Sequence, residues 1–270
     1  MTAAAVSACD ALDGLVDGII AAPENCYFNP HTLVGKSFNC SGVNTTYTAS
    51  AACKGAQTTN GTFLWYGLNP RPPFSGLLNT TCSNLTTGCG PAPFTISSDW
   101  IGLWIENNPA FDITSMSFAD YDTIFHQSNN QYASIIGTAD PDLSAFAANS
   151  GKMITWHGLA DQLIFPNGTV DYYNRVLAGD PAAHEYYRFF EAPGVGHCGG
   201  GFGPVPSTAF ESVVSWVETG VEPATLNGTS APDVNGTVKV QPLSPYRLVS
   251  AYQGRDPAIA SSFACTATFK

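Results

Sequence analysis

The sequence predicts an α/β fold with a parallel sheet, and the order of its apolar segments is the first reason. Residues 152–156 (KMITW) and 186–191 (YYRFFE) are short apolar runs that end at turn residues, as buried strands do. Residues 169–178 and 208–219 carry apolar side chains at helical spacing, and Gly220 closes the second of these segments. The order strand, helix, strand, helix is typical of a parallel sheet that is flanked by helices.

A carboxylate and an imidazole that follow the two predicted strands are the second reason. Asp161 follows the first strand and His197 follows the second. Catalytic and binding residues of an open α/β sheet lie at the carboxyl ends of its strands. In α/β-hydrolases the catalytic triad follows the chain order Ser, Asp, His. The carboxylate would orient the imidazole, which would take the proton of a serine hydroxyl. The alternative is that Asp161 caps the next helix and His197 is an ordinary loop residue.

The serine that this triad requires is not evident in the sequence. It should precede Asp161 on a G-x-S-x-G turn, and no such pentapeptide occurs. Residues 1–151 also lack the several apolar strands that would build the front of the sheet. The segment 1–8 (MTAAAVSA) has neither the basic nor the apolar region of a signal peptide. We therefore expect the nucleophile and the first half of the sheet to come from an N-terminal part that lies upstream of Met1.

Composition excludes several classes of protein. Hydrophobic residues make up 44% of the chain and charged residues 11%, against about 25% in an average protein, which argues against disorder. The net charge is −11 and the few basic residues do not cluster, so no nucleic-acid partner is expected. No stretch of about 18 apolar residues is present, so no membrane span is expected.

Glycosylation sequons and cysteines indicate an oxidising compartment. The chain has eight cysteines and eight N-x-S/T sequons. The sequons begin at Asn39, Asn44, Asn60, Asn79, Asn84, Asn167, Asn227 and Asn235. Together they favour a secreted, disulfide-bonded glycoprotein. The alternative is a chain rich in Thr and Asn whose sequons arise by chance.

An acidic loop near the N-terminus is a candidate metal site. Three carboxylates fall within eight residues, and they belong to Asp10, Asp13 and Asp17. Crowded carboxylates repel one another unless a cation joins them, and a flexible loop of oxygen ligands suits Ca²⁺. The pattern is not that of an EF-hand, and the alternative is a solvated loop whose aspartates cap helices. Cys9 and Cys26 bracket the loop, so a disulfide could close it.

Three of these segments together resemble the tannase/feruloyl esterase family. They are CDALDGLVDGII at 9–20, HGLADQLI at 157–164 and YYRFFEAPGVGHCGGG at 186–201. Their order and rough spacing agree as well, and the resemblance covers most of the chain. It implies an α/β-hydrolase sheet with a large inserted lid. It also implies Ser-His-Asp hydrolysis of esters of aromatic acids, gallic or hydroxycinnamic, in plant polyphenols or cell walls.

The resemblance also assigns residues and domains. Asp161 and His197 resemble the triad members. The calcium ligands that it implies are the carboxylates of Asp10, Asp13 and Asp17 and the backbone carbonyls of Leu15 and Ile19. Residues 1–28 would be the calcium-loop segment of the catalytic domain, 29–149 an irregular, disulfide-rich lid, and 150–270 the C-terminal half of the catalytic domain.

The cysteine pairs follow from the same resemblance. Cys198 would pair with a cysteine beside the catalytic serine, outside this chain. The other expected pairs are Cys9–Cys26, Cys40–Cys53 and Cys82–Cys89. Ser244 stands where the family has a cysteine that pairs near the C-terminus, which leaves Cys265 without that partner.

Further expectations concern the lid and the tail. Residues 98–106 should form a helix with Trp100 and Trp104 on one face, and 119–125 a second helix that continues toward Tyr132. The Pro-rich tail after Glu222 should lie on the surface. His157 is expected to be structural or exposed, as are the histidines at 31, 126 and 184.

Two functions are compatible with the sequence. In the first, the chain is part of a secreted carboxylesterase and is inactive without its N-terminal part. In the second, it is a catalytically inactive, secreted, calcium-stabilised fragment or binding module. The first is preferred, because half of a parallel sheet would expose an apolar face and edge.

Overall fold

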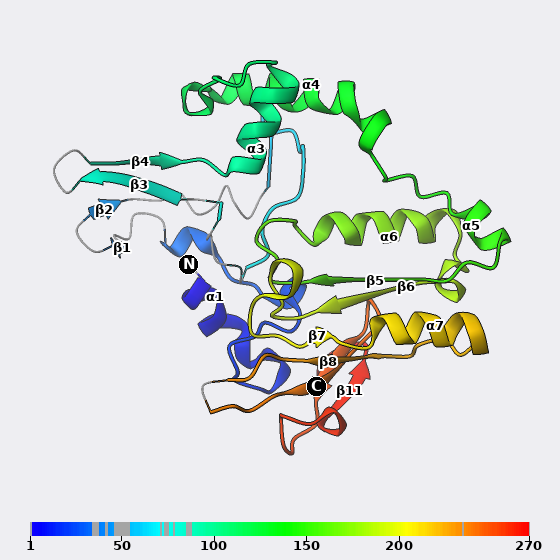
Figure 1. Ribbon diagram of the computed structural model, residues 1–270. Coiled ribbons are helices and arrows are strands. Elements are labelled where there is room, and N and C mark those ends of the chain that lie inside the picture. The colour runs from blue at the N-terminus through cyan, green and yellow to red at the C-terminus, as the bar shows by residue number, and fades with distance from the viewer. Residues whose placement is uncertain are drawn as a thin grey trace. The chain divides into compact units, whose positions relative to one another are not determined.

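The computed structural model describes residues 2–33, 38–40, 43–45, 55–70, 72, 76–77, 79–84, 88–233 and 235–269. The chain forms two compact units (Figure 1). The first contains Met1–Cys53, Gly67–Pro72 and Asp140–Lys270, and the second contains Lys54–Tyr66 and Pro73–Ala139. The assignment of these parts to a lid and a catalytic domain stays a prediction.

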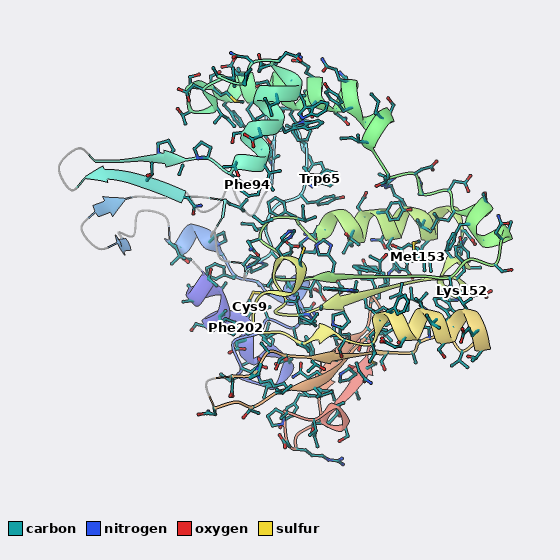
Figure 2. All side chains as sticks on the ribbon, viewed as in Figure 1. Cys9, Trp65, Phe94, Lys152, Met153 and Phe202 are labelled. Atoms are coloured by element: carbon teal, nitrogen blue, oxygen red, sulfur yellow. A yellow bond between two sulfur atoms is a disulfide. The ribbon has the colours of Figure 1, made fainter. Side chains whose placement is uncertain are left out.

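The first unit is built around a parallel pair of strands. Strand β5 (Met153–Gly158) pairs in parallel with β6 (Tyr187–Ala192), and helix α6 (Asn167–Gly179) connects them. Helix α7 (Ala209–Thr219) follows β6. The predicted order of strand, helix, strand and helix and the parallel pairing are therefore confirmed, with boundaries within a few residues. Figure 2 labels Lys152 and Met153 where β5 begins.

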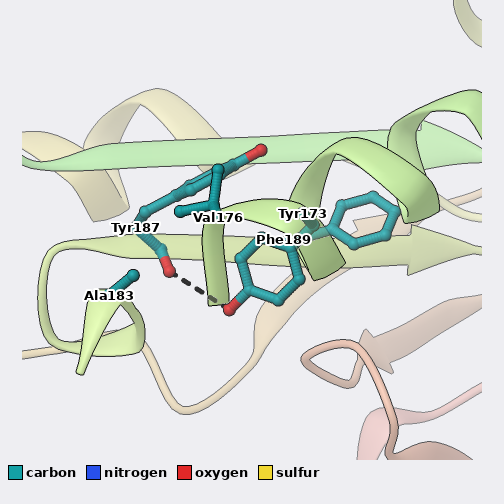
Figure 3. Packing of buried hydrophobic residues seen from close by; sticks show 5 residues of the cluster. All are labelled: Tyr173, Val176, Ala183, Tyr187 and Phe189. Atoms are coloured by element: carbon teal, nitrogen blue, oxygen red, sulfur yellow. Dashed lines mark hydrogen bonds between the residues drawn. The ribbon is translucent and has the colours of Figure 1, made fainter. Parts of the chain in front are cut away.

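Alternate side chains of β6 supply two separate parts of the core. Tyr187 and Phe189 point to the α6 face and pack on Tyr173 and Val176 of that helix (Figure 3). The Tyr173 hydroxyl donates a hydrogen bond to the backbone oxygen of Tyr187 at 3.3 Å, so its polar end is satisfied inside this cluster. Phe190, on the opposite face, packs in a second cluster with residues of the C-terminal strands. Both faces of β6 are thus buried, which explains why its sequence is almost continuously apolar.

The tail after Glu222 is not a surface stretch, so that prediction was wrong. Strands β7 (Val205–Pro206), β8 (Leu226–Thr229) and β9 (Val240–Leu243) form an antiparallel sheet. Strands β10 (Val249–Tyr252) and β11 (Phe263–Thr266) form a hairpin. Leu226 and Leu243 are buried in the cluster on Phe190. The strands were missed because each has only two to four residues, too few for a clear two-residue period.

The N-terminal segment begins with helix α1 (Thr2–Cys9) and continues as short 3₁₀ turns. These turns are η1 (Asp10–Asp13), η2 (Pro23–Asn25) and η3 (Pro30–Leu33). The predicted disulfide Cys9–Cys26 is present, with Cα atoms 5.4 Å apart. Ala5, Cys9 and Ile20 form a small buried cluster around it. The disulfide therefore closes the acidic loop at both ends.

The remaining elements are short strands and several helices. The hairpins are β1 (Phe38–Cys40) with β2 (Val43–Thr45), and β3 (Asn79–Asn84) with β4 (Gly88–Ala92). The helices are α3 (Thr95–Asp99), the π-helical turn η4 (Trp100–Ile105), η5 (Ile113–Ser115), α4 (Phe118–Ile136), α5 (Ser144–Ala148), and the short turns η6 (Ala183–Glu185), η7 (His197–Gly199) and η8 (Ala260–Ser262). Within the part of the chain that the structure describes, no helix is long and apolar enough to cross a membrane.

The second unit confirms both helices expected there. The predicted helix at 98–106 begins at Thr95 and is π-helical from Trp100 onward. The rings of Trp100 and Trp104 stack with centroids 5.8 Å apart and planes inclined by 22°, so they do share one face. Helix α4 is longer than its predicted core because a capping box starts it, in which Ser117 and Asp120 bond each other's backbone.

The other predicted disulfides within the chain lie wholly or partly outside the described residues. Cys53 lies outside the described residues, and so do the side chains of Cys40, Cys82 and Cys89. The backbone places Cys82 directly opposite Cys89 in the β3–β4 register. Among the cysteines with described side chains, Cys198 and Cys265 are free thiols.

Introducing a cysteine at position 244 is expected to stabilise the protein. The buried Ser244 hydroxyl contacts the Cys265 thiol, so a cysteine there is within reach of the existing one. Closing the loop between these residues should add about 3 kcal/mol to the free energy of unfolding by the chain-entropy account. Urea unfolding of Ser244→Cys in a Cys198→Ser background, with and without reductant, measures the effect. Ser244→Ala should show no gain, and an S244C variant whose midpoint ignores reductant would contradict the expectation.

Candidate active site

Asp161 and His197 meet at the carboxyl ends of β5 and β6. The loops that carry them are tied together, because the Ala160 amide donates a hydrogen bond to the Val195 carbonyl at 2.9 Å. A Cβ at Gly158 would lie 2.3 Å from that same carbonyl oxygen. Glycine is therefore required where the first strand ends, because any side chain would push the two loops apart.

The Asp161 carboxylate is bound on both oxygens. His197 Nδ1 donates to its Oδ2 at 3.2 Å, and the Leu163 and Ile164 amides each donate to its Oδ1 at 2.8 Å. The side chain of Asp161 is 6% exposed, whereas that of His197 is 34% exposed. Asp161 does not cap the next helix, because the N-cap position of α6 is Pro166; one oxygen of Asp161 instead accepts from the turn at 161–164 and the other faces the imidazole.

The setting of His197 fixes its backbone as well as its ring. Its amide donates to the Gln162 side-chain oxygen at 3.3 Å. It lies in the short turn η7 with Cys198 at φ 54°, a left-handed conformation that is uncommon for residues other than glycine. The exposed Cys198 sulfur is 3.4 Å from His197 Nε2. The predicted disulfide from Cys198 to another polypeptide stays a prediction.

His157 is a site residue that the sequence analysis missed. Its Nε2 lies 2.9 Å from the Ile164 carbonyl and 3.4 Å from Asp161 Oδ2, and its Nδ1 lies 2.8 Å from the Thr169 hydroxyl. The sequence did contain a signal, since His157 lies near the end of the strand and four residues before Asp161. Spacing alone does not show that the ring turns back toward Asp161.

The acidic loop is organised around Asp10. Its Oδ1 accepts hydrogen bonds from the amides of Asp17, Gly18 and Ile19 at 3.3, 3.0 and 3.1 Å. Asp13 Oδ1 accepts from the Leu15 amide at 3.0 Å. Asp10 Oδ2 also accepts from the Gly18 amide at 3.1 Å, and Asp17 Oδ1 accepts from the Ile19 amide at 3.1 Å, so the loop curls around the Asp10 carboxylate.

Four of the five predicted calcium ligands line one small cavity. The cavity has a volume of about 40 Å³, and its wall includes Asp13, Leu15, Asp17 and Ile19. Burial, together with the nearby charges of Asp17 and Asp10, raises the pKa of Asp13 to about 6 against the lowering effect of the hydrogen bond from the Leu15 amide. The carboxylates of Asp13 and Asp17 are the hard oxygen donors that Ca²⁺ prefers, and Leu15 and Ile19 line the same cavity, so these four residues fit that ion. Asp10, the fifth predicted ligand, does not line the cavity and accepts amide hydrogens of the loop instead.

Two further observations bear on this cavity. Lys239 Nζ lies 3.0 Å from Asp17 Oδ2, a cation 222 residues away that the sequence analysis did not connect with the loop. Glu191 also lines the cavity, and burial raises its pKa to about 7. Across the described ranges, no three His, Cys, Asp or Glu side chains already converge as the ligands of a metal. The calcium assignment stays a prediction.

Comparison with known proteins identifies the family. A family model described as tannase and feruloyl esterase matches residues 94–266. A probable feruloyl esterase of Arthroderma benhamiae is 38% identical over 279 aligned residues, which cover 98% of this chain and 51% of that protein. The chain belongs to the tannase and feruloyl esterase family.

Solved structures of this family share the fold of the chain. The tannin acyl hydrolase of Aspergillus niger aligns with a TM-score of 0.82 and 25% identity, covering 97% of this chain and 52% of that one. An esterase of Aspergillus oryzae aligns with a TM-score of 0.76 and 26% identity, covering 98% and 55%. The family's esterases thus confirm an α/β-hydrolase-like fold. The chain spans about half the length of the relatives and structures that it matches.

Proposed function

We propose that this chain is the C-terminal part of a serine-type carboxylic ester hydrolase that acts on esters of aromatic acids. The observation that carries the proposal is the hydrogen bond of 3.2 Å between a buried Asp161 carboxylate and a partly exposed His197 imidazole. It lies at the carboxyl ends of two parallel strands, where α/β-hydrolases hold these two groups. Membership of the tannase and feruloyl esterase family supports the reaction class.

In this mechanism His197 is the general base and then the general acid. Asp161 accepts the Nδ1 hydrogen, which leaves Nε2 with a lone pair for the proton of a serine hydroxyl. The serine attacks the ester carbonyl, and the imidazolium returns the proton to the departing alcohol. Water then releases the aromatic acid from the acyl-serine by the same proton transfers in reverse order.

We place the serine on an N-terminal part that precedes residue 1. The sequence contains no G-x-S-x-G turn, and the chain covers about half of its relatives. Strand β5 pairs only with β6 among the described strands, so its other edge is open to a further strand. A disulfide from Cys198 to a cysteine beside that serine would fasten His197 to the nucleophile.

The substrate class and the compartment follow from the same proposal. Relatives are named for feruloyl esters and tannins, which are esters of hydroxycinnamic and gallic acids. We therefore propose plant polyphenols or cell-wall esters as substrates and a secreted, N-glycosylated enzyme. Ca²⁺, held by the loop at 10–19, would supply structural stabilisation there and no step of the reaction.

Turnover of aromatic esters tests the proposal directly. Methyl ferulate and methyl gallate should be hydrolysed when the chain is produced together with its upstream polypeptide, and not by residues 1–270 alone. Released acid is measured by liquid chromatography. Hydrolysis by the isolated chain would overturn the placement of the serine. If the joined polypeptides stay inactive on both esters, the alternative of an inactive, calcium-stabilised binding module is favoured.

A further inference from the structure

We infer that His157 is a positioning residue that holds the Asp161 carboxylate for His197. This inference rests on the proposed catalytic role of Asp161 and His197. It arises because Asp161 Oδ2 lies between two imidazoles, 3.2 Å from His197 Nδ1 and 3.4 Å from His157 Nε2.

The contacts of His157 determine where its ring hydrogen lies. Nε2 is 2.9 Å from the Ile164 carbonyl oxygen, which only accepts hydrogen bonds, so Nε2 carries a hydrogen. Nδ1 is 2.8 Å from the Thr169 hydroxyl, which donates to it in the tautomer that carries the hydrogen on Nε2. The Nε2 hydrogen is therefore donated to the Ile164 carbonyl in the turn that follows β5, and Asp161 Oδ2 lies 3.4 Å from the same nitrogen.

The Nε2–H group of His157 adds a restraint on the Asp161 carboxylate that the amides of the turn do not supply. The Leu163 and Ile164 amides hold Oδ1 only, so the carboxylate plane could still rotate about that oxygen. The His157 Nε2–H anchors the end of the same turn through the Ile164 carbonyl, and its partial positive charge lies 3.4 Å from Oδ2. The side chain of His157 is 12% exposed, so water competes little for this contact.

Thr169 acts on Asp161 indirectly, through the ring of His157. It lies in the first turn of α6, and its hydroxyl is the only described partner of His157 Nδ1. Because valine has nearly the same shape as threonine, Thr169→Val removes this hydrogen bond and preserves the packing. Thr169→Ser keeps the hydroxyl and serves as the matched control.

The tautomer of His197 is the readout, because a residue that only stabilises the fold would not change it. Long-range ¹⁵N–¹H NMR on the 270-residue chain at about pH 8, where a free imidazole is neutral, distinguishes Nδ1–H from Nε2–H. We expect His197 in the Nδ1–H form and His157 in the Nε2–H form. Each set of imidazole signals is assigned to its histidine by its disappearance when that histidine is replaced. In His157→Phe, His197 should become a mixture in which Nε2–H predominates.

Two further variants separate positioning from folding. His157→Gln places an amide N–H near the position of Nε2 and should restore most of the Nδ1–H form of His197. Thr169→Val should give an intermediate mixture, and Thr169→Ser the wild-type spectrum. A His157→Phe protein that is folded by circular dichroism and keeps His197 as Nδ1–H would overturn the inference. If His157→Phe fails to fold, Thr169→Val takes its place: a folded Thr169→Val protein that keeps His197 entirely as Nδ1–H would overturn the inference.

Kinetics distinguish failure of this inference from failure of the proposed function. In the chain joined to its serine-bearing part, His157→Phe should lower kcat about tenfold with KM unchanged, and His157→Gln should recover most of that loss. A complete enzyme that hydrolyses neither ferulate nor gallate esters contradicts the proposed function, while the tautomer of His197 still tests His157. Normal kcat in His157→Phe, in an active enzyme, contradicts the positioning role alone.

Discussion

Replacing His197 with alanine is expected to lower kcat for aromatic esters by at least about 10⁴-fold in the enzyme that includes the serine-bearing part. The reason is that the imidazole is the group placed to move the serine proton, and Asp161 holds it through Nδ1 at 3.2 Å. Asp161→Asn should cost about 10⁴-fold as well, because an amide N–H facing Nδ1 favours the wrong tautomer. KM should change little in either variant, since neither residue is expected to bind the ground-state ester strongly.

Steady-state kinetics on methyl ferulate measure this effect, and His184→Ala provides the matched control. His184 is exposed, and among the described residues its Nδ1 contacts only the Pro181 carbonyl, so its loss should leave kcat within about twofold. Thermal unfolding should show that His197→Ala remains folded, because the His197 side chain is one-third exposed. Activity in His197→Ala equal to that of the parent would remove this residue from the mechanism.

The parallel strand pair was predictable because both faces of it are buried. Phe189 and Phe190 pack in different clusters, so burial imposes a run of apolar residues that is visible in the sequence. Asp161 and His197 were predictable for a related reason, since residues that directly follow parallel strands must meet at one edge of the sheet. Neither prediction needed knowledge of distant contacts.

The parts that were missed depend on contacts between distant segments. The strands β8 and β9 are short, and Leu226 and Leu243 are buried only because they pack near Phe190. The Lys239–Asp17 pair joins residues 222 positions apart, which no local pattern indicates. His157 is different, because its spacing from Asp161 was visible but its ring direction depends on how the turn folds back.

Calcium is expected to raise the melting temperature of the chain, and Asp13→Asn is expected to abolish most of that increase. Asp13 lines the cavity with Leu15, Asp17 and Ile19, and its carboxylate has no cation partner there among the described side chains. An ion at 1,000 times its dissociation constant would stabilise the folded state by about 4 kcal/mol. Differential scanning calorimetry with millimolar Ca²⁺ or with chelator measures the change. Asp171→Asn, an exposed aspartate on α6, should keep the full calcium response.

The pH dependence of this response should follow from Asp13. Burial raises its folded-state pKa from 3.8 to about 6, so the metal-free folded protein binds the proton more tightly than the unfolded chain does. The contribution of Asp13 to stability without metal is therefore present below about pH 4 and is lost as the pH rises through 6. Calcium needs the deprotonated carboxylate, so its stabilising effect should instead grow between about pH 5 and 7. A melting temperature that ignores calcium at pH 7 would mean that the Lys239 ammonium on Asp17 is the loop's own counter-charge and that no ion binds.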